Sequence, residues 1–115
     1  MPIYFLDSSG IVKRYVLETG SIWIRSICLS APIGTLYIAA IAGVETVAAI
    51  TRRVLQGTTA SGEAVSAIAN LKYQLVSDYV SVEFNDSLQR AAMDLAGKHV
   101  LRGCDAVQLA SVLQV

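Results

Sequence analysis

Three carboxylates stand at places in the sequence where chemistry is expected. Asp7 follows an apolar run, Glu45 lies in the first turns of a helical stretch that follows a short strand-like segment, and Asp105 begins the last helical stretch. In an open parallel sheet, ligands bind beyond the carboxyl ends of the strands, so we expect these side chains to share one cleft. A cluster of carboxylates repels itself unless a cation neutralises it, and hard oxygen ligands select Mg²⁺ or Mn²⁺. Such a cation polarises a phosphodiester and helps to form an attacking hydroxide.

Each of the three acids also has a purely structural interpretation. Asp7 can cap a helix through its side chain. Glu45 can pair with Arg52 or Arg53 as a surface charge, and Asp105 is favourable at a helix start because of the helix dipole. The spacing alone therefore leaves a metal site and a set of helix caps both open.

The elements that would position these acids follow from apolar periodicity and turn residues. We expect strands at Ile3–Leu6, Thr35–Ile38 and Tyr79–Phe84. We expect helices after Asp7, from Gly20-Ser21 to before Pro32, around Val44–Leu55 up to Gly57, from Ser61 to Leu75, from the cap Asn85 to near Gly97, and from Gly103–Asp105 onward. Strands separated by helices predict right-handed βαβ units and a parallel sheet. Residues 1–115 are therefore expected to form one α/β domain.

The composition is apolar for a chain of this size. Hydrophobic residues make up 54% of the 115 residues and charged residues only 16%. This predicts either strands that are buried on both faces or a surface that needs a partner. In the last helix we expect the apolar side to be formed by Ala106, Leu109, Ala110 and Leu113.

Charge and cysteine usage limit the function and the compartment. The formal net charge is zero, so any contact with nucleic acid must come from a local patch or a metal rather than from bulk charge. Cys28 and Cys104 are far apart and form no CxxC pair, which favours a reduced, cytoplasmic protein. No signal peptide is expected. Ala31–Ile50 is long and apolar, but Glu45 and several Gly and Pro residues interrupt it, so no membrane span is expected either.

Three local motifs surround the three acids. They are YFLDSSGIVKRY at Tyr4–Tyr15, AGVETVAA at Ala42–Ala49, and HVLRGCDAVQLA at His99–Ala110. Together, in this order, they resemble the acidic segments of the metal-dependent PIN-domain ribonucleases, and in particular the toxin half of a bacterial VapBC-type toxin–antitoxin pair. The resemblance runs over essentially the whole chain.

The resemblance implies a fold, a reaction and partners. It implies a PIN-like three-layer α/β/α architecture with a parallel sheet, in which Asp7, Glu45 and Asp105 hold Mg²⁺ or Mn²⁺ and carry catalysis. Ser9 would assist near Asp7, and RNA would be cleaved by a metal-activated water. The expected partners are the RNA substrate, a second copy of the chain in a homodimer, and a cognate antitoxin protein. The candidates for phosphate contact are Arg14, Arg52, Arg53 and Arg102.

The sequence departs from the family pattern at its carboxyl end. Members of the family continue past the last helix into a strand that ends in a fourth acidic residue, whereas this sequence stops at Val115. We therefore expect the usual C-terminal strands and the fourth carboxylate to be lacking, which would weaken metal binding and turnover. In the family's sheet order that strand lies beside Ile3–Leu6, so we expect an open apolar edge there and an oligomeric or unusually unstable protein.

Two other functions compete with the ribonuclease. The chain can be a catalytically impaired PIN-like remnant that acts as a dimerisation or antitoxin-binding module, or a small-ligand-binding α/β domain unrelated to nucleases. Other catalytic sites are disfavoured, because the only histidine, His99, cannot form a His-rich metal site, no GxGxxG motif follows the first strand, and Gly57–Gly62 lacks the lysine of a phosphate loop.

Overall fold

The first strand and helix meet where the sequence turns from apolar to polar. A computed structural model describes residues 2–115, and in it β1 (Tyr4–Phe5) is followed by α1 (Ser8–Tyr15). Asp7 is the N-cap of α1: its backbone is extended, with φ −78° and ψ 172°, and its side chain accepts a hydrogen bond from the Gly10 N–H. A short polar side chain at this position satisfies one of the unpaired donors of the first helical turn.

The remaining elements alternate as the sequence predicts. They are α2 (Ser21–Ser30), β2 (Leu36–Ala39), α3 (Ala42–Leu55), α4 (Ser61–Ser77), β3 (Tyr79–Val82), α5 (Asp86–His99) and α6 (Gly103–Leu113). Asn85 caps α5, as expected, by accepting a hydrogen bond from the Leu88 N–H. β1 and β3 are shorter than the expected ranges, and β2 is shifted by one residue toward the carboxyl end. Differences of one or two residues are common at the ends of elements.

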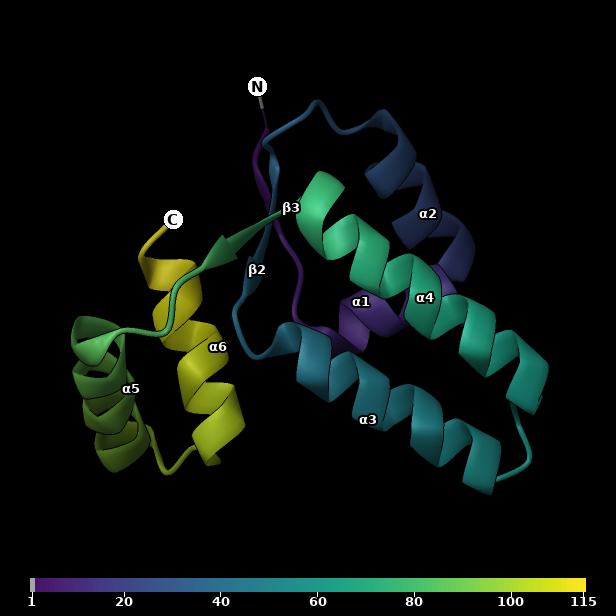
Figure 1. The fold of residues 1–115 in the computed structure, drawn as a ribbon. Coiled ribbons are helices and arrows are strands. Elements are labelled where there is room, and N and C mark those ends of the chain that lie inside the picture. The colour runs from purple at the N-terminus through teal and green to yellow at the C-terminus, as the bar shows by residue number, and fades with distance from the viewer. Residues whose placement is uncertain (1) are drawn as a thin grey trace.

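The three strands form one parallel sheet with the order β1-β2-β3. Tyr4 pairs with Leu36, and Leu36 pairs with Tyr79 on its other side. The predicted parallel sheet is therefore confirmed, and β1 lies at its edge, as expected. Figure 1 shows α5 and α6 on one side of the sheet and the other four helices on the opposite side, so the molecule is a three-layer α/β/α structure. No helix in the described part of the chain is long and apolar enough to cross a bilayer.

The hydrophobic core is divided by the sheet. Central strand β2 is buried along most of its length, with Leu36, Ile38 and Ala39 almost inaccessible to solvent. Large side chains fill the layer of α1 to α4, where Ile11, Ile50 and Leu71 are buried. The buried cluster between α5 and α6 consists of Leu88 and three alanines, Ala92, Ala106 and Ala110.

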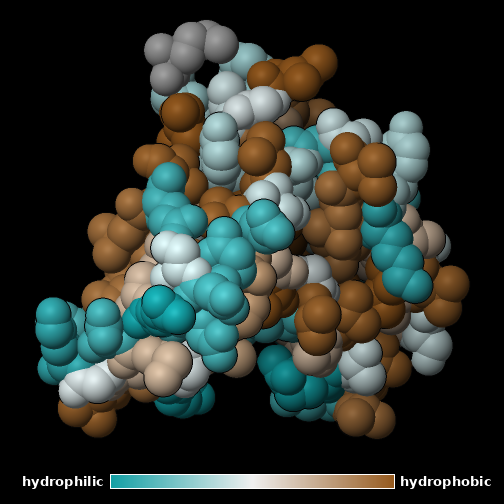
Figure 2. Space-filling view, turned by 60° about the vertical axis from the view of Figure 1, so that its left-hand side comes forward, coloured by the Kyte–Doolittle hydropathy of each residue, from teal (hydrophilic) through white to brown (hydrophobic). Residues whose placement is uncertain are grey.

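Much of the remaining apolar sequence lies at the surface. Figure 2 shows brown apolar side chains scattered over the visible face between polar patches. Exposed large apolar residues occur in most elements, for example Trp23 and Leu29 on α2, Val76 on α4, and Leu113 on α6. The expected buried strand is found in β2 alone, while the exposed apolar side chains leave the expectation of a partner as a prediction.

Candidate functional site

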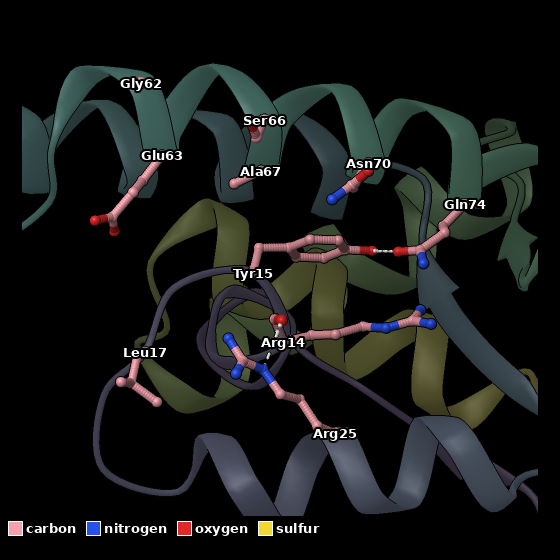
Figure 3. A pocket seen from close by; sticks show the side chains of 10 residues that line it. All are labelled: Arg14, Tyr15, Leu17, Arg25, Gly62, Glu63, Ser66, Ala67, Asn70 and Gln74. Carbon is pink, nitrogen blue, oxygen red and sulfur yellow. Dashed lines mark hydrogen bonds between the residues drawn. The ribbon is translucent and has the colours of Figure 1, made fainter.

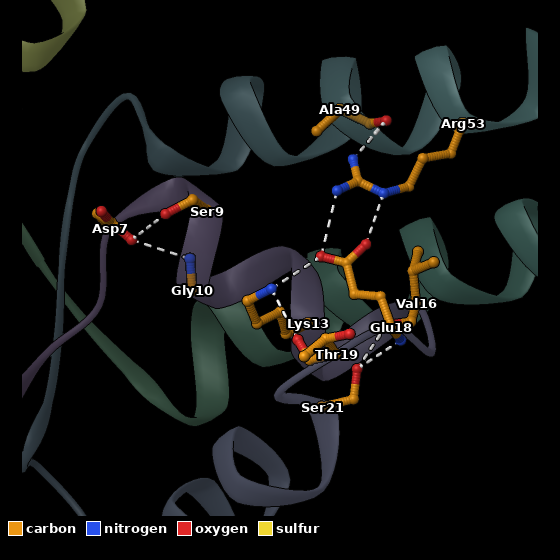
Figure 4. A network of polar contacts seen from close by, with 10 residues as sticks. All are labelled: Asp7, Ser9, Gly10, Lys13, Val16, Glu18, Thr19, Ser21, Ala49 and Arg53. Atoms are coloured by element: carbon orange, nitrogen blue, oxygen red, sulfur yellow. Dashed lines mark hydrogen bonds and ion pairs between the residues drawn. The ribbon is translucent and has the colours of Figure 1, made fainter. Parts of the chain in front are cut away.

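Asp7 is held firmly at the carboxyl end of β1. Its Oδ1 accepts hydrogen bonds from the Gly10 N–H at 2.9 Å and from the Ser9 hydroxyl at 2.8 Å (Figure 4). A Cβ atom at Gly10 would lie 3.3 Å from that oxygen, so the missing side chain makes room for the carboxylate. The predicted cap is confirmed, and Ser9 lies beside Asp7 as expected.

Glu45 is in the first turn of α3 and is half-buried. Its Oε1 accepts a hydrogen bond of 2.7 Å from Nε2 of Gln108, which lies on α6. Gln108 is only 9% exposed. This contact joins the two layers that flank the sheet, because α3 and α6 lie on opposite sides of it.

Gln108 is the residue of this region that the sequence reasoning missed. Its Oε1 is buried and has no hydrogen-bond partner within residues 2–115. The helix face expected for α6 was wrong in part: Ala106 and Ala110 are buried, but Leu109 and Leu113 are exposed, and Gln108 and Ser111 take their place. The position of Gln108 between Ala106 and Ala110, both expected on the apolar side of the helix, was the signal that could have indicated its burial.

Asp105 lies in the first turn of α6, where it is favourably placed for the helix dipole. Its carboxylate is 3.5 Å from Arg102 Nε, and both side chains are exposed. Its neighbour Cys104 is close to Glu45: desolvation and the Glu45 carboxylate together raise the pKa of the Cys104 thiol. Glu45 and Cys104 are thus neighbours and line the same cleft.

The expectation of one shared cleft is wrong: Glu45 and Asp7 line two clefts that have no lining residue in common, and Asp105 lines neither. One, of about 400 Å³, is lined by Ser8, Ser9, Glu45, Cys104 and Arg52, among others. The other, of about 490 Å³, is lined by Asp7, Gly10 and Gln108 together with apolar side chains of β1, α2 and α6. Ser9 lines the cleft of Glu45 and bonds to Asp7, and Gln108 lines the cleft of Asp7 and bonds to Glu45. These two side chains therefore connect the two clefts.

A closed metal shell is not formed by protein side chains alone. Within residues 2–115 no three His, Cys, Asp or Glu side chains are grouped so that they could hold a metal ion. The donor set still fits Mg²⁺, because this ion usually binds through one or two carboxylates and keeps several waters. Asp7 and Glu45 provide carboxylates, and the buried Gln108 Oε1 is an oxygen that lacks a donor.

The four arginines expected to contact phosphate lie in different surroundings. Arg52 is exposed and lines the cleft of Glu45. Arg53 instead forms an ion pair with Glu18, with Nε to Oε2 at 2.8 Å (Figure 4). Glu45 therefore pairs with neither Arg52 nor Arg53, and the surface ion pair considered for it is not found. Arg102 is exposed beside Asp105.

Arg14 lies in a separate polar pocket between α1, α2 and α4. Its guanidinium donates to Asp78 at 2.8 Å and to the Tyr79 hydroxyl at 2.9 Å. Figure 3 shows it beside Tyr15, whose hydroxyl bonds to Gln74. Burial raises the pKa of Tyr15, and the neighbouring Tyr79 adds to the effect. Arg14 therefore lines a different pocket from Glu45 and Ser9, and its charge is already compensated.

Comparison of the chain with models of protein families and with curated protein sequences finds no match.

Proposed function

We propose that this protein is a metal-dependent endoribonuclease of PIN-like architecture, the toxin component of a toxin–antitoxin pair. The observation that carries the proposal is the position of Ser9. Its hydroxyl bonds to Asp7, and its side chain lines the cleft that also contains Glu45. Two acids from motifs far apart in the sequence are thereby brought to one end of a parallel sheet, where such folds bind ligands.

The roles of the residues follow from their positions. Asp7 and Glu45, with Asp105 from the start of α6, would hold Mg²⁺ or Mn²⁺. The bound ion supplies Lewis acidity and an activated water against the RNA phosphodiester. Ser9 and Gly10 fix the Asp7 carboxylate through two hydrogen bonds. This arrangement leaves Asp7 Oδ2 without a hydrogen bond among the residues that the structure describes.

Arg52 is the best placed of the arginines to contact a substrate phosphate. It lies in the cleft of Glu45 and forms no ion pair within the described part of the chain, whereas Arg53 next to it is held by Glu18. A guanidinium binds phosphate oxygens in a bidentate manner. The local positive charge suits a chain whose formal net charge is zero.

The exposed apolar surface and the open edge of β1 support the partners that we propose. These are a second copy of the chain in a homodimer and a cognate antitoxin protein in the cytoplasm. Exposed apolar side chains on most elements offer contact area to a partner, and an open strand edge is a template for pairing with another chain.

Cleavage of a mixed RNA pool tests the proposed activity. The wild type with Mn²⁺ is expected to cut RNA, and the activity should disappear with EDTA and in Asp7→Asn. Asp94→Asn is the matched control, because Asp94 is an exposed aspartate on α5, away from both clefts. Cleavage that survives EDTA, or that Asp7→Asn leaves intact, would contradict the proposal.

A second function is favoured by one observation, namely that residues 2–115 hold no ready-made cluster of three metal ligands. The alternative is a catalytically impaired PIN-like remnant that acts as a dimerisation or antitoxin-binding module. Calorimetric titration with Mn²⁺ separates the two. Binding that is lost in Asp7→Asn supports the nuclease, and a wild type without any Mn²⁺ binding supports the interaction module.

A further inference from the structure

The side-chain amide of Gln108 is the least satisfied polar group in the candidate site. Its Nε2 donates to Glu45 Oε1 at 2.7 Å, while its buried Oε1 has no hydrogen-bond partner within residues 2–115. Buried polar groups in native proteins are almost always hydrogen-bonded, and an exception calls for an explanation. The explanation must come from what surrounds this oxygen.

The orientation of the amide follows from its partner. If the amide were turned by 180°, its oxygen would face Glu45 Oε1 at the distance of 2.7 Å that Nε2 now has. Two acceptors would then oppose each other, because a carboxylate offers no proton. The NH₂ group therefore points to Glu45, and the oxygen is the atom that is left without a donor.

The surroundings of Gln108 provide no donor from the protein. Gln108 lies in the second cleft with Asp7 and Gly10, and of the donor-bearing side chains there, Tyr4 and Trp23, neither bonds to its Oε1. Gly10 uses its N–H for Asp7 Oδ1. A water or a hydrated ligand would supply the missing donor, and the Glu45 carboxylate in contact with Gln108, together with Asp7 in the same cleft, favours the hydration shell of a cation.

We propose that Gln108 is a positioning residue for a divalent cation held by Asp7 and Glu45. Its Nε2 fixes the orientation of the Glu45 carboxylate, and its Oε1 accepts a hydrogen bond from the hydration shell of the cation. This inference rests on the proposed function, since it assigns a residue to the same site. Mg²⁺ and Mn²⁺ suit the role because Mg²⁺ in particular retains several waters when bound.

Gln108→Met should affect Mn²⁺ binding strongly and metal-free stability little. Methionine has a similar length but no hydrogen-bonding amide, so Mn²⁺ affinity should fall by about 10–100-fold, as is typical when a residue that orients a metal ligand is removed. Without metal the same change removes a buried unsatisfied acceptor, which stabilises, and the Nε2 hydrogen bond to Glu45, which destabilises, so the Tm in EDTA should change little. A merely structural role for the amide predicts a lower Tm and an unchanged Mn²⁺ affinity.

Calorimetric titration with MnCl₂ and thermal unfolding in EDTA measure the two effects. Gln89→Met is the matched control, because Gln89 is exposed on α5 and should change neither quantity. Unchanged Mn²⁺ affinity in Gln108→Met, or lost affinity together with a lower Tm in EDTA, overturns the inference while the proposed function stands. A wild type that binds no Mn²⁺ overturns both.

A second variant keeps the test informative if Gln108→Met does not fold. Gln108→Glu retains an oxygen acceptor but sets a second carboxylate against Glu45. We expect the Tm of Gln108→Glu in EDTA to fall, because like charges repel at short distance. We also expect added Mn²⁺ to raise the Tm of this variant by more than it raises the Tm of the wild type. An increase equal to or smaller than that of the wild type would count against a cation near Gln108.

Discussion

The ion pair between Glu18 and Arg53 provides the sharpest stability prediction. Glu18 lies between α1 and α2, and its carboxylate accepts two hydrogen bonds from the Arg53 guanidinium, at 2.8 and 3.2 Å. Lys13 adds a longer contact of 3.3 Å to the same carboxylate. The change Glu18→Gln removes the charge while it keeps the size of the side chain.

The magnitude follows from the exposure of the pair. Side-chain exposures of 24% for Glu18 and 25% for Arg53 place it between a surface pair and a buried one. Exposed pairs contribute about 0.2–1 kcal/mol and breaking a buried pair costs about 3–5 kcal/mol. We therefore expect Glu18→Gln to lower the free energy of unfolding by about 1–2 kcal/mol, or the Tm by about 4–8 °C for a chain of this length.

The effect should depend on pH in a defined direction. Burial by itself raises the pKa of Glu18, but the bonds from Arg53 and Lys13 outweigh it and lower that pKa overall. A lowered folded-state pKa means that the stabilisation is present above the unfolded pKa of about 4.3 and is lost as the pH falls through the folded value. The difference in Tm between wild type and Glu18→Gln should thus be full at pH 7 and shrink in acid.

Thermal unfolding followed by circular dichroism at pH 7 and in acid measures this difference. Glu63→Gln is the matched control, since Glu63 is exposed and has no ion pair within the described residues. A Tm difference that is the same at both pH values, or an equally large effect of Glu63→Gln, would refute the reasoning.

Four further predictions address other features. Asp7→Ala should lower the free energy of unfolding by about 1 kcal/mol through loss of the cap, whereas Asp7→Asn should keep most of it, because asparagine also caps helices; denaturant titrations that do not separate the two variants would contradict this. Iodoacetamide should modify the exposed Cys104 in the native protein and spare the buried Cys28, and Cys104 should react more slowly at pH 8 than a free cysteine because its pKa is raised. Ile3→Lys at the open edge of β1 should reduce self-association in light scattering, and an oligomer that persists unchanged would place the contact elsewhere. Val100 has a left-handed backbone with φ 53° and is 94% exposed, so Val100→Gly should stabilise the protein by up to about 1 kcal/mol, and a lower Tm would count against strain at this turn.

The order and type of the elements could be predicted because they depend on local sequence. The cap residues Asp7 and Asn85 each stand directly before the helix that they begin. The parallel sheet follows from strands that alternate with helices. The last helix shows where local reasoning fails, since apolar periodicity selected Leu109, which is exposed, over Gln108, which is buried.

The contacts of the site could be predicted only in part. The positions of Asp7, Glu45 and Asp105 at helix starts depend on topology and are found as expected. The partner of a side chain depends instead on tertiary packing. Glu45 bonds to Gln108 from the opposite layer rather than to an arginine of its own helix. Likewise Arg14 is held by Asp78 and Tyr79, which no local pattern connects to it.

The division of the core has a consequence for how the site assembles. The buried cluster of α5–α6 has fewer residues than those of the α1 to α4 layer, so we expect this pair to open as a separate unit of low local stability. Gln108 and Asp105 belong to this unit, whereas Asp7 and Glu45 belong to the other layer. Every transient opening of α5–α6 therefore takes the site apart. We expect a ligand that bridges the two layers to slow amide hydrogen exchange throughout α5 and α6 and not only at the residues that it contacts.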